Sequence, residues 1–366
     1  MFDIVLFGAT GFTGALTARY LAKAAGPEVR WAVAGRDRGK LEALGLGVPV
    51  LVADAREPGE LARRTRVVAT TVGPYLEYGE PLVRACAEAG THYVDLTGEP
   101  EFVDWMYLRY DALAASTGAK LVHACGFDSI PWDLGVLNTV NRLPEDVPIR
   151  IDGFLRGKLG ASGGTFASAL AMMSRVPQMV EAHGQRKAAD PVPEGRRVSS
   201  RPGGVRHVGG WALPMPTIDV RIVGRSARLL DRYGPDFAYR QYYAVKRLPQ
   251  AVAAVAGAAG VAALAQVPPA REWLAKRLPR GTGPSPEQRA RHWFEATLVG
   301  RGGGERVVTR VSGGDAGYDE TAKMLAESAL CLAFDRTPER AGQLTTASAM
   351  GEPLIERLRA AGIHFT

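Results

Sequence analysis

The sequence MFDIVLFGATGFTG, residues 1–14, combines a strand pattern with the beginning of a helix pattern. The run from Asp3 to Phe7 has the length and the β-branched content of one buried strand. Gly8, Gly11 and Gly14 follow at three-residue spacing, and apolar residues then recur at the spacing of a helix. This order predicts a buried strand, a tight glycine turn and a helix.

The glycine turn has the features of a phosphate-binding site. The first turn of a helix exposes unpaired backbone N–H groups at the positive end of the helix dipole. A pyrophosphate fits there if no side chain blocks the backbone, which accounts for Gly8 and Gly11. Gly14 would allow the helix to pack close to the strand.

A glycine triplet also has a simpler interpretation, because such triplets occur in ordinary loops. The spacing here is GxxGxxG rather than the commoner GxGxxG. Since a strand pattern precedes the triplet and a helix pattern follows it, we predict a dinucleotide-binding turn. The residues of this predicted turn are Gly8, Ala9, Thr10, Gly11, Phe12, Thr13 and Gly14.

The residue after the second strand indicates which nucleotide binds. Residues 29–35 read as that strand, and Arg36 follows it. An acidic residue at this distance from the glycines bonds a ribose 2′-hydroxyl, whereas an arginine suits a 2′-phosphate. Asp37 could serve the hydroxyl instead, and Arg36 could be a solvated loop residue. We predict NADP(H), with Arg36 on the 2′-phosphate and Asp54 near the adenine amino group.

Strand and helix patterns alternate up to about residue 145, which predicts a Rossmann α/β domain, a doubly wound parallel sheet with helices on both faces. Ligands of such sheets lie beyond the carboxyl ends of the strands. The fourth strand therefore places Val72, Gly73, Pro74 and Tyr75 beside the nicotinamide half of the cofactor. The expected strands are residues 48–53, 66–72, 92–96 and 120–124, and the expected helices are residues 40–44, 57–64, 79–89, 101–116 and 129–143.

From residue 147 the pattern changes to alternating segments, which predict half-exposed strands. Strands mixed with helices, without regular βαβ spacing, predict an inserted α+β second domain at residues 146–314. Helices within residues 315–366 are expected to fold back onto the first domain, residues 1–145. The alternating segments are residues 149–155, 217–223, 293–299 and 307–311, and a further helix is expected at residues 166–176.

Two segments of the second domain have unusual composition. Residues 183–210 are rich in basic residues, Gly and Pro, and predict a long, mobile loop that could steer an acidic partner or simply be solvated. No aromatic residues are interleaved with its charges, which argues against a nucleic-acid partner. Residues 251–265 are apolar but too few to span a bilayer, so we expect a buried or surface-docked helix, with peripheral lipid contact as the alternative.

Composition excludes several classes of protein. The 366 residues suffice for two domains, and 46% hydrophobic and 23% charged residues with a net charge of +7 are typical of a globular chain. Cys86, Cys125 and Cys331 form no CxxC pair, which argues against disulfides and metal sites and favours a cytoplasmic location. The opening apolar run enters the glycine turn, so we expect no signal peptide.

Several longer stretches fit together as the pattern of one family. They are GATGFTG (8–14), VAGR (33–36), TTVGPYLEYGEPLVRACAEAGTHYVDLTGE (70–99), HACGFDSIPWDLG (123–135), GYDETAKMLAESALCLAF (317–334) and GQLTTASAMGEPLIERLRAAGI (342–363). In them the chain resembles the saccharopine dehydrogenase-like oxidoreductases, and most of all the trans-acting enoyl reductases of actinobacterial lipid and polyketide synthesis. The resemblance covers nearly the whole chain and is weakest across residues 183–290.

The resemblance implies a Rossmann domain with an inserted α+β domain, a nicotinamide cofactor and the reduction of an α,β-unsaturated acyl thioester. Residues 129–131, Ser-Ile-Pro, stand where saccharopine reductases have Pro-Gly, which speaks against saccharopine chemistry. The alternatives are a saccharopine dehydrogenase-type enzyme that reduces a C=N bond, and a lipid-associated protein that holds the cofactor without turnover.

Enoyl reduction needs a proton donor as well as a hydride. The hydride goes to the β-carbon, an enolate forms, and a proton must reach the α-carbon. We predict Tyr75, Tyr78 and Asp128 as catalytic candidates, with Ser129 and Lys158 nearby. Tyrosine is favoured because its hydroxyl can donate at neutral pH. Backbone N–H groups within residues 126–129 or 163–165 could hold the oxyanion.

A substrate carried by an acyl carrier protein would suit two features of the chain. Carrier proteins are acidic, which matches the basic stretch 183–210, where Arg196 and Arg197 would be the contact residues. A long acyl chain needs an apolar trough, which residues 251–265 could line. A homodimer and peripheral membrane association are further expectations.

Overall fold

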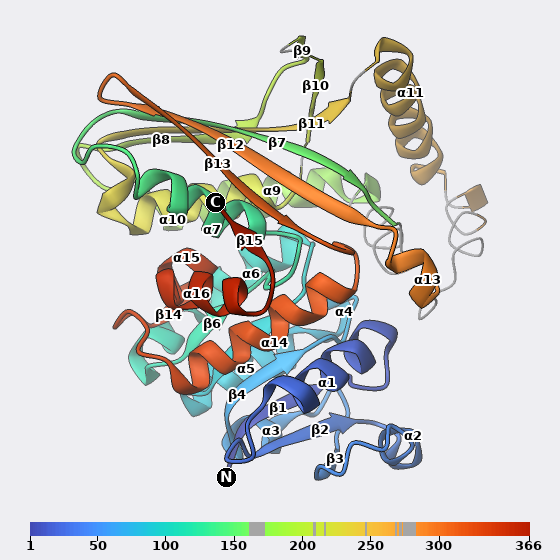
Figure 1. Ribbon diagram of the computed structural model, residues 1–366. Helices are drawn as coiled ribbons and strands as arrows, with labels where there is room; N and C mark the ends of the chain where they lie inside the picture. Colours follow the sequence, from blue (N-terminus) through green and yellow to red (C-terminus); the bar gives the residue numbers. More distant parts are fainter. Residues whose placement is uncertain are drawn as a thin grey trace. The chain divides into compact units, whose positions relative to one another are not determined.

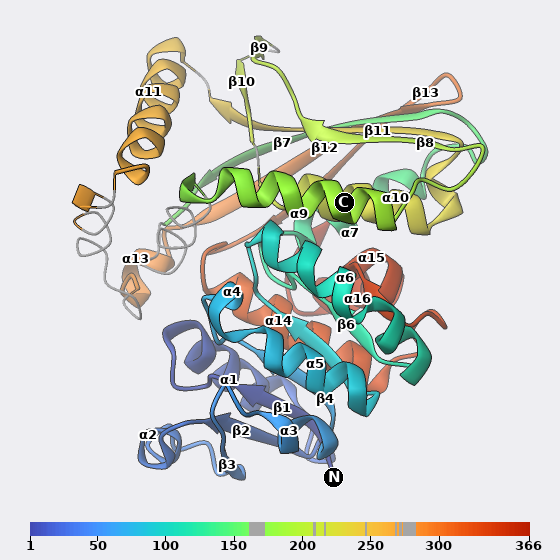
Figure 2. The same ribbon diagram turned by 180° about the vertical axis from the view of Figure 1, so that it is seen from behind.

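The computed structural model describes residues 1–160, 173–207, 210–215, 217–245, 247–267, 269–270, 273 and 283–366. The chain forms two compact units, each built around one sheet (Figures 1 and 2). The first unit comprises Met1–Ile130 and Tyr318–Ile363, and the second comprises Pro131–Gly317 and His364–Thr366. The first boundary therefore lies at Ile130, earlier than the expected residue 145.

The first unit contains a parallel sheet of seven strands in the order β14-β6-β5-β4-β1-β2-β3. The order reverses between β1 and β4, and doubly wound sheets bind their ligands at such a switch point. The predicted Rossmann arrangement is thus confirmed. The strands are β1 (Phe2–Phe7), β2 (Trp31–Gly35), β3 (Val50–Val52), β4 (Thr65–Thr70), β5 (His92–Asp95), β6 (Lys120–Val122) and β14 (Gly342–Leu344).

Helices cover both faces of this parallel sheet. Helices α1 and α14 lie against one face, and α3, α5 and α6 lie against the other. The expected return of the C-terminal helices is observed, because α14 and β14 belong to the first unit. The helices are α1 (Phe12–Ala24), α2 (Arg38–Glu42), α3 (Gly59–Arg63), α4 (Tyr75–Tyr78), α5 (Glu80–Ala89), α6 (Pro100–Thr117), α14 (Asp319–Phe334), α15 (Thr346–Ala349) and α16 (Glu352–Ala360).

The second unit contains a mixed sheet of eight strands in the order β15-β13-β12-β7-β11-β10-β9, with β8 beside β11. Strand β7 runs parallel to β11 and antiparallel to β12, so the expected α+β character is confirmed. The strands are β7 (Ile149–Lys158), β8 (Arg197–Pro202), β9 (Arg206–His207), β10 (Trp211–Pro214), β11 (Asp236–Val245), β12 (Trp293–Gly302), β13 (Glu305–Gly313) and β15 (His364–Phe365).

One face of the mixed sheet is covered by helices α7, α9 and α10, as both views show (Figures 1 and 2). Gly135 of α7 lies against Leu298 and Val311, and the Thr139 hydroxyl lies 2.6 Å from that of Thr309. These contacts place α7 in the second unit rather than in the first. The helices of this unit are α7 (Ile130–Val140), α9 (Val176–Ala189), α10 (Asp219–Leu229), α11 (Leu248–Ala265) and α13 (Pro286–Arg289), with a 3₁₀ turn at Asp231–Tyr233.

Two expectations for the second unit were wrong. Residues 183–210 are not one long loop, since they contain the end of α9 and the strands β8 and β9. Residues 217–223 alternate over a short window, but the apolar residues Ile222, Val223 and Ala227 recur with helical spacing and are buried in α10. Residues 163–165 and most of the helix expected at 166–176 lie outside the described residues.

The helix expected at residues 251–265 is confirmed as α11. Its side chains Val252 and Leu264 are exposed. In the part of the chain that the structure describes, no helix combines the length and apolar character that crossing a bilayer requires.

Candidate functional site

Gly8 and Gly14 are required by the packing of the first unit itself. Gly8 has φ +90°, and a Cβ on it would lie 2.7 Å from Cγ2 of Val72. A Cβ on Gly14 would lie 2.1 Å from the carbonyl oxygen of Gly8. The turn is closed by the Gly11 N–H, which donates to the same Gly8 oxygen at 3.0 Å. These two glycines therefore bring the start of α1 close to the end of β1.

Gly11 is different, because nothing in its surroundings requires a glycine. Its φ of −71° and ψ of 164° suit any residue, and a Cβ on it would meet just the Gly8 oxygen, at 3.4 Å. Helix α1 also begins without a side-chain cap and without an acidic residue in its first turn. The amino end of α1 is therefore left open for an anion, which fits the predicted pyrophosphate position.

The structure separates the roles of the two charged residues after β2. Asp37 caps α2, since its Oδ1 accepts a hydrogen bond from the Lys40 N–H at 3.0 Å. Arg36 is exposed and has no ion pair among the residues that the structure describes. The geometry thus leaves Arg36 available for a 2′-phosphate and commits Asp37 to its own helix. Asp54 is exposed, and its Oδ1 accepts from the Arg56 N–H at 2.9 Å.

Tyr78 lies close to the arginines that follow β2 and β3. The guanidinium carbon of Arg56 is 6.0 Å from the centre of the Tyr78 ring. A hydrogen bond to Glu77 raises the pKa of Tyr78, and the positive charges of Arg56 and Arg36 act on it in the opposite direction. Tyr78 therefore lies beside Arg56, and the charge of the predicted 2′-phosphate ligand Arg36 also acts on it.

Tyr75 is buried, and its hydroxyl is engaged on both sides. The hydroxyl donates to the carbonyl of Thr70 at 3.2 Å and accepts from the Leu96 N–H at 3.1 Å. Burial, followed by the negative charge of Asp95, raises the pKa of Tyr75 well above its ordinary value. The side chain thus ties the end of β4 to the end of β5, and its assignment as an acid remains a prediction.

Glu99 holds the loop that follows β4. Its two carboxylate oxygens accept from the N–H groups of Tyr75 and Leu76, at 3.1 and 2.9 Å. Glu99 therefore caps α4 from a neighbouring strand end, where a carboxylate is favourable at a helix amino terminus. The cap fixes the segment 72–75 that we expect beside the nicotinamide, in which the Gly73–Pro74 bond is cis.

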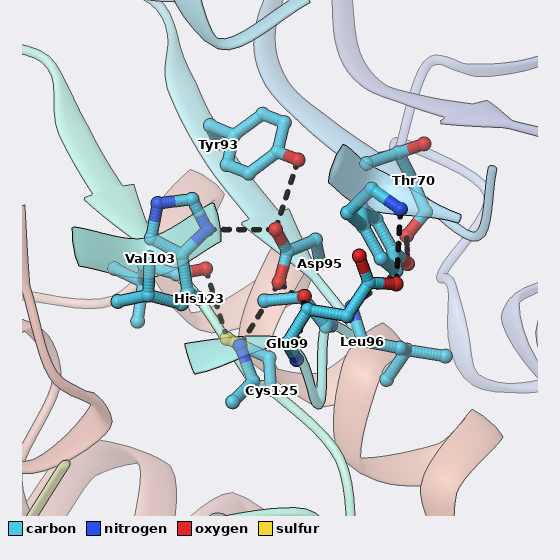
Figure 3. A network of polar contacts seen from close by, with 12 residues as sticks. Thr70, Tyr93, Asp95, Leu96, Glu99, Val103, His123 and Cys125 are labelled. Carbon is cyan, nitrogen blue, oxygen red and sulfur yellow. Dashed lines mark hydrogen bonds and ion pairs between the residues drawn. The ribbon is translucent and has the colours of Figure 1, made fainter. Parts of the chain in front are cut away.

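A fully buried carboxylate, Asp95, connects the ends of β5 and β6 (Figure 3). Its Oδ2 lies 2.7 Å from Nδ1 of His123 and accepts from the Tyr93 hydroxyl at 2.9 Å. Its Oδ1 accepts from the N–H groups of Thr97 and Ala124, at 3.0 and 2.9 Å. Asp95 thus fixes both loops that lead away from the carboxyl edge of the sheet.

Asp128 lies in the second of these loops and is half-buried. A Cβ on Gly98 would lie 3.6 Å from its Oδ1, so the carboxyl group faces the loop after β5. Its side chain makes no hydrogen bond or ion pair to another described residue. Burial, followed by the charge of Asp95, raises the pKa of Asp128 to about 6. Asp128 is thus the predicted candidate that changes protonation near neutral pH.

The neighbouring candidates differ from Asp128. The Ser129 hydroxyl is buried and has no hydrogen-bond partner in the described part of the chain. Lys158 is exposed at the end of β7 in the second unit.

Sequence reasoning missed Asp95, Glu99 and Arg56 as parts of this edge. Asp95 and Glu99 stand at the end of a predicted strand, in the sequence DLTGE, as cofactor-edge residues do. That position was a usable signal. Arg56 had none, because its approach to Tyr78 depends on how the loops after β3 and β4 fold.

Comparison with known proteins agrees with this geometry. Residues 4–122 match the NADP-binding domain of saccharopine dehydrogenase. A candidate trans-acting enoyl reductase of Mycobacterium tuberculosis is 42% identical, over 99% of this chain and 96% of its own length. A trans-acting enoyl reductase of Mycobacterium ulcerans is 37% identical, over 99% of this chain and 96% of its own.

The fold has a solved counterpart as well. The apo structure of saccharopine dehydrogenase (L-Glu forming) from Saccharomyces cerevisiae matches with a TM-score of 0.59 at 12% identity, over 100% of this chain and 99% of that one. That likeness concerns the fold alone. Because the mycobacterial relatives are similar along nearly their whole length, the chain belongs to the trans-acting enoyl reductase family, with an NADP-binding domain of the saccharopine dehydrogenase type.

Proposed function

We propose that the protein is an NADPH-dependent enoyl reductase that saturates the α,β-double bond of an acyl thioester made by a separate synthase. The observation that carries the proposal is Asp128, a half-buried carboxyl group without a side-chain partner, beyond the carboxyl edge of an NADP-binding sheet. With a pKa raised to about 6, it can hold a proton near neutral pH and release it to a substrate carbon.

The residues of the first unit fit the cofactor. The turn Gly8–Gly14 and the uncapped amino end of α1 would hold the pyrophosphate, and the exposed Arg36 would hold the 2′-phosphate. Residues 72–75, fixed by Glu99, would border the nicotinamide. When bound, NADPH supplies the hydride that reaches the β-carbon of the substrate.

The protein itself must then manage one proton. As the β-carbon gains the hydride, the π electrons of the double bond move toward the thioester and form an enolate. Asp128, protonated, gives its proton to the α-carbon and regains one from solvent. Asp95 acts through position and charge, since it fixes the loop of Asp128 and its negative charge helps to keep Asp128 protonated. Tyr75 positions the ends of β4 and β5 in this scheme.

We further propose that the acyl group arrives on an acyl carrier protein. An enzyme that acts in trans must meet a substrate that stays attached to the synthase system. The exposed apolar side chains of α11, Val252 and Leu264, are where contact with an acyl chain or a lipid surface would be expected.

The proposal is tested by NADPH oxidation over a panel of enoyl thioesters of increasing chain length, with the products identified by mass. We expect saturated thioesters that carry one deuterium from labelled NADPH at the β-carbon. A cyclic imine serves as the control for C=N reduction. NADPH oxidation over the imine but over no enoyl thioester would overturn the proposal, and NADPH binding without any turnover would favour a binding protein.

A further inference from the structure

The arginines that the sequence suggested for partner recognition are engaged within the second unit. Arg196 has a side chain only 12% exposed and donates to the carbonyls of Ala227 and Leu230, at 2.6 and 2.9 Å. Arg197 is paired with Asp236 at 2.9 Å, and Arg186 is buried. Of the two expected contact residues, Arg196 is therefore committed to the fold, whereas Arg197 is exposed and already paired with a carboxylate.

A different set of cations lies on the face of the mixed sheet that the helices leave uncovered. Along β7 the buried residues Ile149, Ile151 and Leu155 alternate with exposed ones, as expected for a sheet covered on one side. The pairing registers place the exposed positions of β8, β11, β12 and β13 on the same side as those of β7. The exposed cations of this face are Arg156, Lys158, Arg201, Arg240, Arg306 and Arg310.

We name these six side chains the basic face. Among the residues that the structure describes, none of the six forms an ion pair. Arg201 and Arg240 are direct cross-strand partners, so two like charges stand side by side. Like charges in contact are unfavourable for the isolated protein, and a negative surface laid over them would relieve the repulsion.

Two of the acidic residues on the same side of the sheet are already paired, and a third, Glu295, lies directly opposite Arg156 on the neighbouring strand. Asp236 is paired with Arg150 at 2.8 Å and with Arg197. Asp152 is paired with Arg206 at 3.1 Å and with Arg301 at 3.4 Å. The remaining charge of the six cations is therefore not balanced by these two carboxylates.

The centre of this side is rigid rather than adaptable. Phe154 and Tyr242 stack with their ring centres 5.2 Å apart, and the Arg206 guanidinium lies 4.3 Å from the centre of the Tyr242 ring. Tyr242 is buried, so it offers no free ring for a nucleic-acid base. A second copy of the chain would bring the same positive charge against itself. The occupant that suits a broad, firm and positive surface is an acidic protein domain.

We propose that the basic face is the docking surface for the acidic carrier protein that presents the enoyl thioester. The identity of the partner as an acyl carrier protein rests on the proposed function. The positive charge of the surface does not depend on it. Charges spread over β13, β7, β11 and β8 steer an acidic partner in diffusion and fix its orientation, and both effects weaken as salt is added.

The test compares two double variants that carry the same change in net charge. Arg201→Glu with Arg240→Glu reverses the cross-strand pair on the basic face. Lys23→Glu with Lys187→Glu is the matched control, at exposed lysines of α1 and α9. Each variant is assayed with an enoyl group on an acidic holo-acyl carrier protein and with the same enoyl group on coenzyme A, after thermal melting has shown that it is folded.

We expect the basic-face variant to lower kcat/KM for the carrier-borne substrate by about tenfold or more, with the coenzyme A thioester and the control variant unaffected. An equal loss on both substrates, or an equal loss in the control, would overturn the docking surface. Affinity for the holo-carrier without an acyl group is measured in parallel by calorimetry. This binding measurement tests the docking surface even if the protein reduces no enoyl thioester.

Competing occupants are tested with the wild-type chain in the same buffer. The probes are a short single-stranded RNA and vesicles that contain phosphatidylserine. Tighter binding to either probe than to the holo-carrier, weakened by the basic-face variant, would replace the carrier by that partner and overturn the proposal.

Discussion

The two sheets of this protein differ in how many of their faces are covered by helices and in where their polar residues lie. The parallel sheet of the first unit is buried on both faces, so β1 and β2 carry almost no exposed residue, and its polar groups gather where strands end. The mixed sheet of the second unit is covered on one face, so β7 and β12 alternate, and charges spread along the strands. The comparison suggests that residues at the ends of the parallel strands carry out the reaction, and that residues on the exposed face of the mixed sheet bind the partner protein.

The largest effect should come from the carboxyl group at the edge of the parallel sheet. Replacing Asp128 by Asn removes the acidic proton, and we expect turnover to fall by about 10²–10⁴-fold with NADPH affinity unchanged. Since the pKa of Asp128 is raised to about 6, wild-type turnover should decline as the pH rises through about 6, when the proton is lost. A wild-type pH profile that persists in the variant would assign the proton to another group.

The stability of the protein gives a second comparison between the two units. Asp95→Ala leaves His123, Tyr93 and two backbone N–H groups without their acceptor in a buried site, which should cost about 3–5 kcal/mol of unfolding free energy. Asp231→Ala removes a fully exposed carboxylate paired with Arg196, and should hardly change the unfolding free energy, because solvent screens an exposed ion pair. Urea unfolding measures both. Equal costs would show that burial does not separate the two sites.

The glycines of the first turn allow binding to be separated from folding. Gly14→Leu should prevent folding, because its Cβ alone would lie 2.1 Å from a backbone oxygen. Gly11→Leu should fold normally and weaken NADPH binding by about 100-fold, equal to ~2.7 kcal/mol, because the side chain occupies the phosphate position. Thermal melting and fluorescence titration with NADPH give the two readouts. A folded Gly11→Leu protein with unchanged affinity would place the pyrophosphate elsewhere.

The smallest effect concerns the choice between the two nucleotides. Arg36→Ala should reduce the preference for NADPH over NADH by about tenfold, because a charge-assisted contact with the 2′-phosphate is lost. Asp37→Asn should leave the preference nearly unchanged, since Asp37 caps α2. Dissociation constants for both nucleotides at low and high salt provide the measurement. A loss of preference with Asp37→Asn alone would reverse the two assignments.

The same difference in coverage explains what could be predicted from the sequence. Strands buried on both faces appear as apolar runs, so β1, β2 and β4 were predicted from the sequence. Strand β8 has the polar sequence RVSSRP, because half of its residues face solvent, and it was taken for part of a loop. For α10, a seven-residue window was too short to distinguish alternation from a helical period.

The site shows a similar limit. The glycine turn, Arg36 and Asp128 could be predicted as site residues because each follows the end of a strand, and strand ends can be recognised in a sequence. The state of Tyr75 depends on Thr70 and Leu96, which approach its hydroxyl after folding. The network around Asp95 likewise unites two strand ends separated by a helix. Partners of this kind cannot be read from a single sequence.

The return of residues 318–363 to the first unit has a consequence for biosynthesis. Helix α14 contributes buried residues along almost its whole length, and it lies against β1, β4 and β5. On a translating ribosome, residues 1–130 therefore emerge with one face of their sheet covered by α1 alone, and they must wait for the whole intervening unit before α14 completes the cover. The nascent amino-terminal segment is the species that a chaperone would meet, and the nucleotide-binding unit is completed only after residues 318–363 have been synthesised.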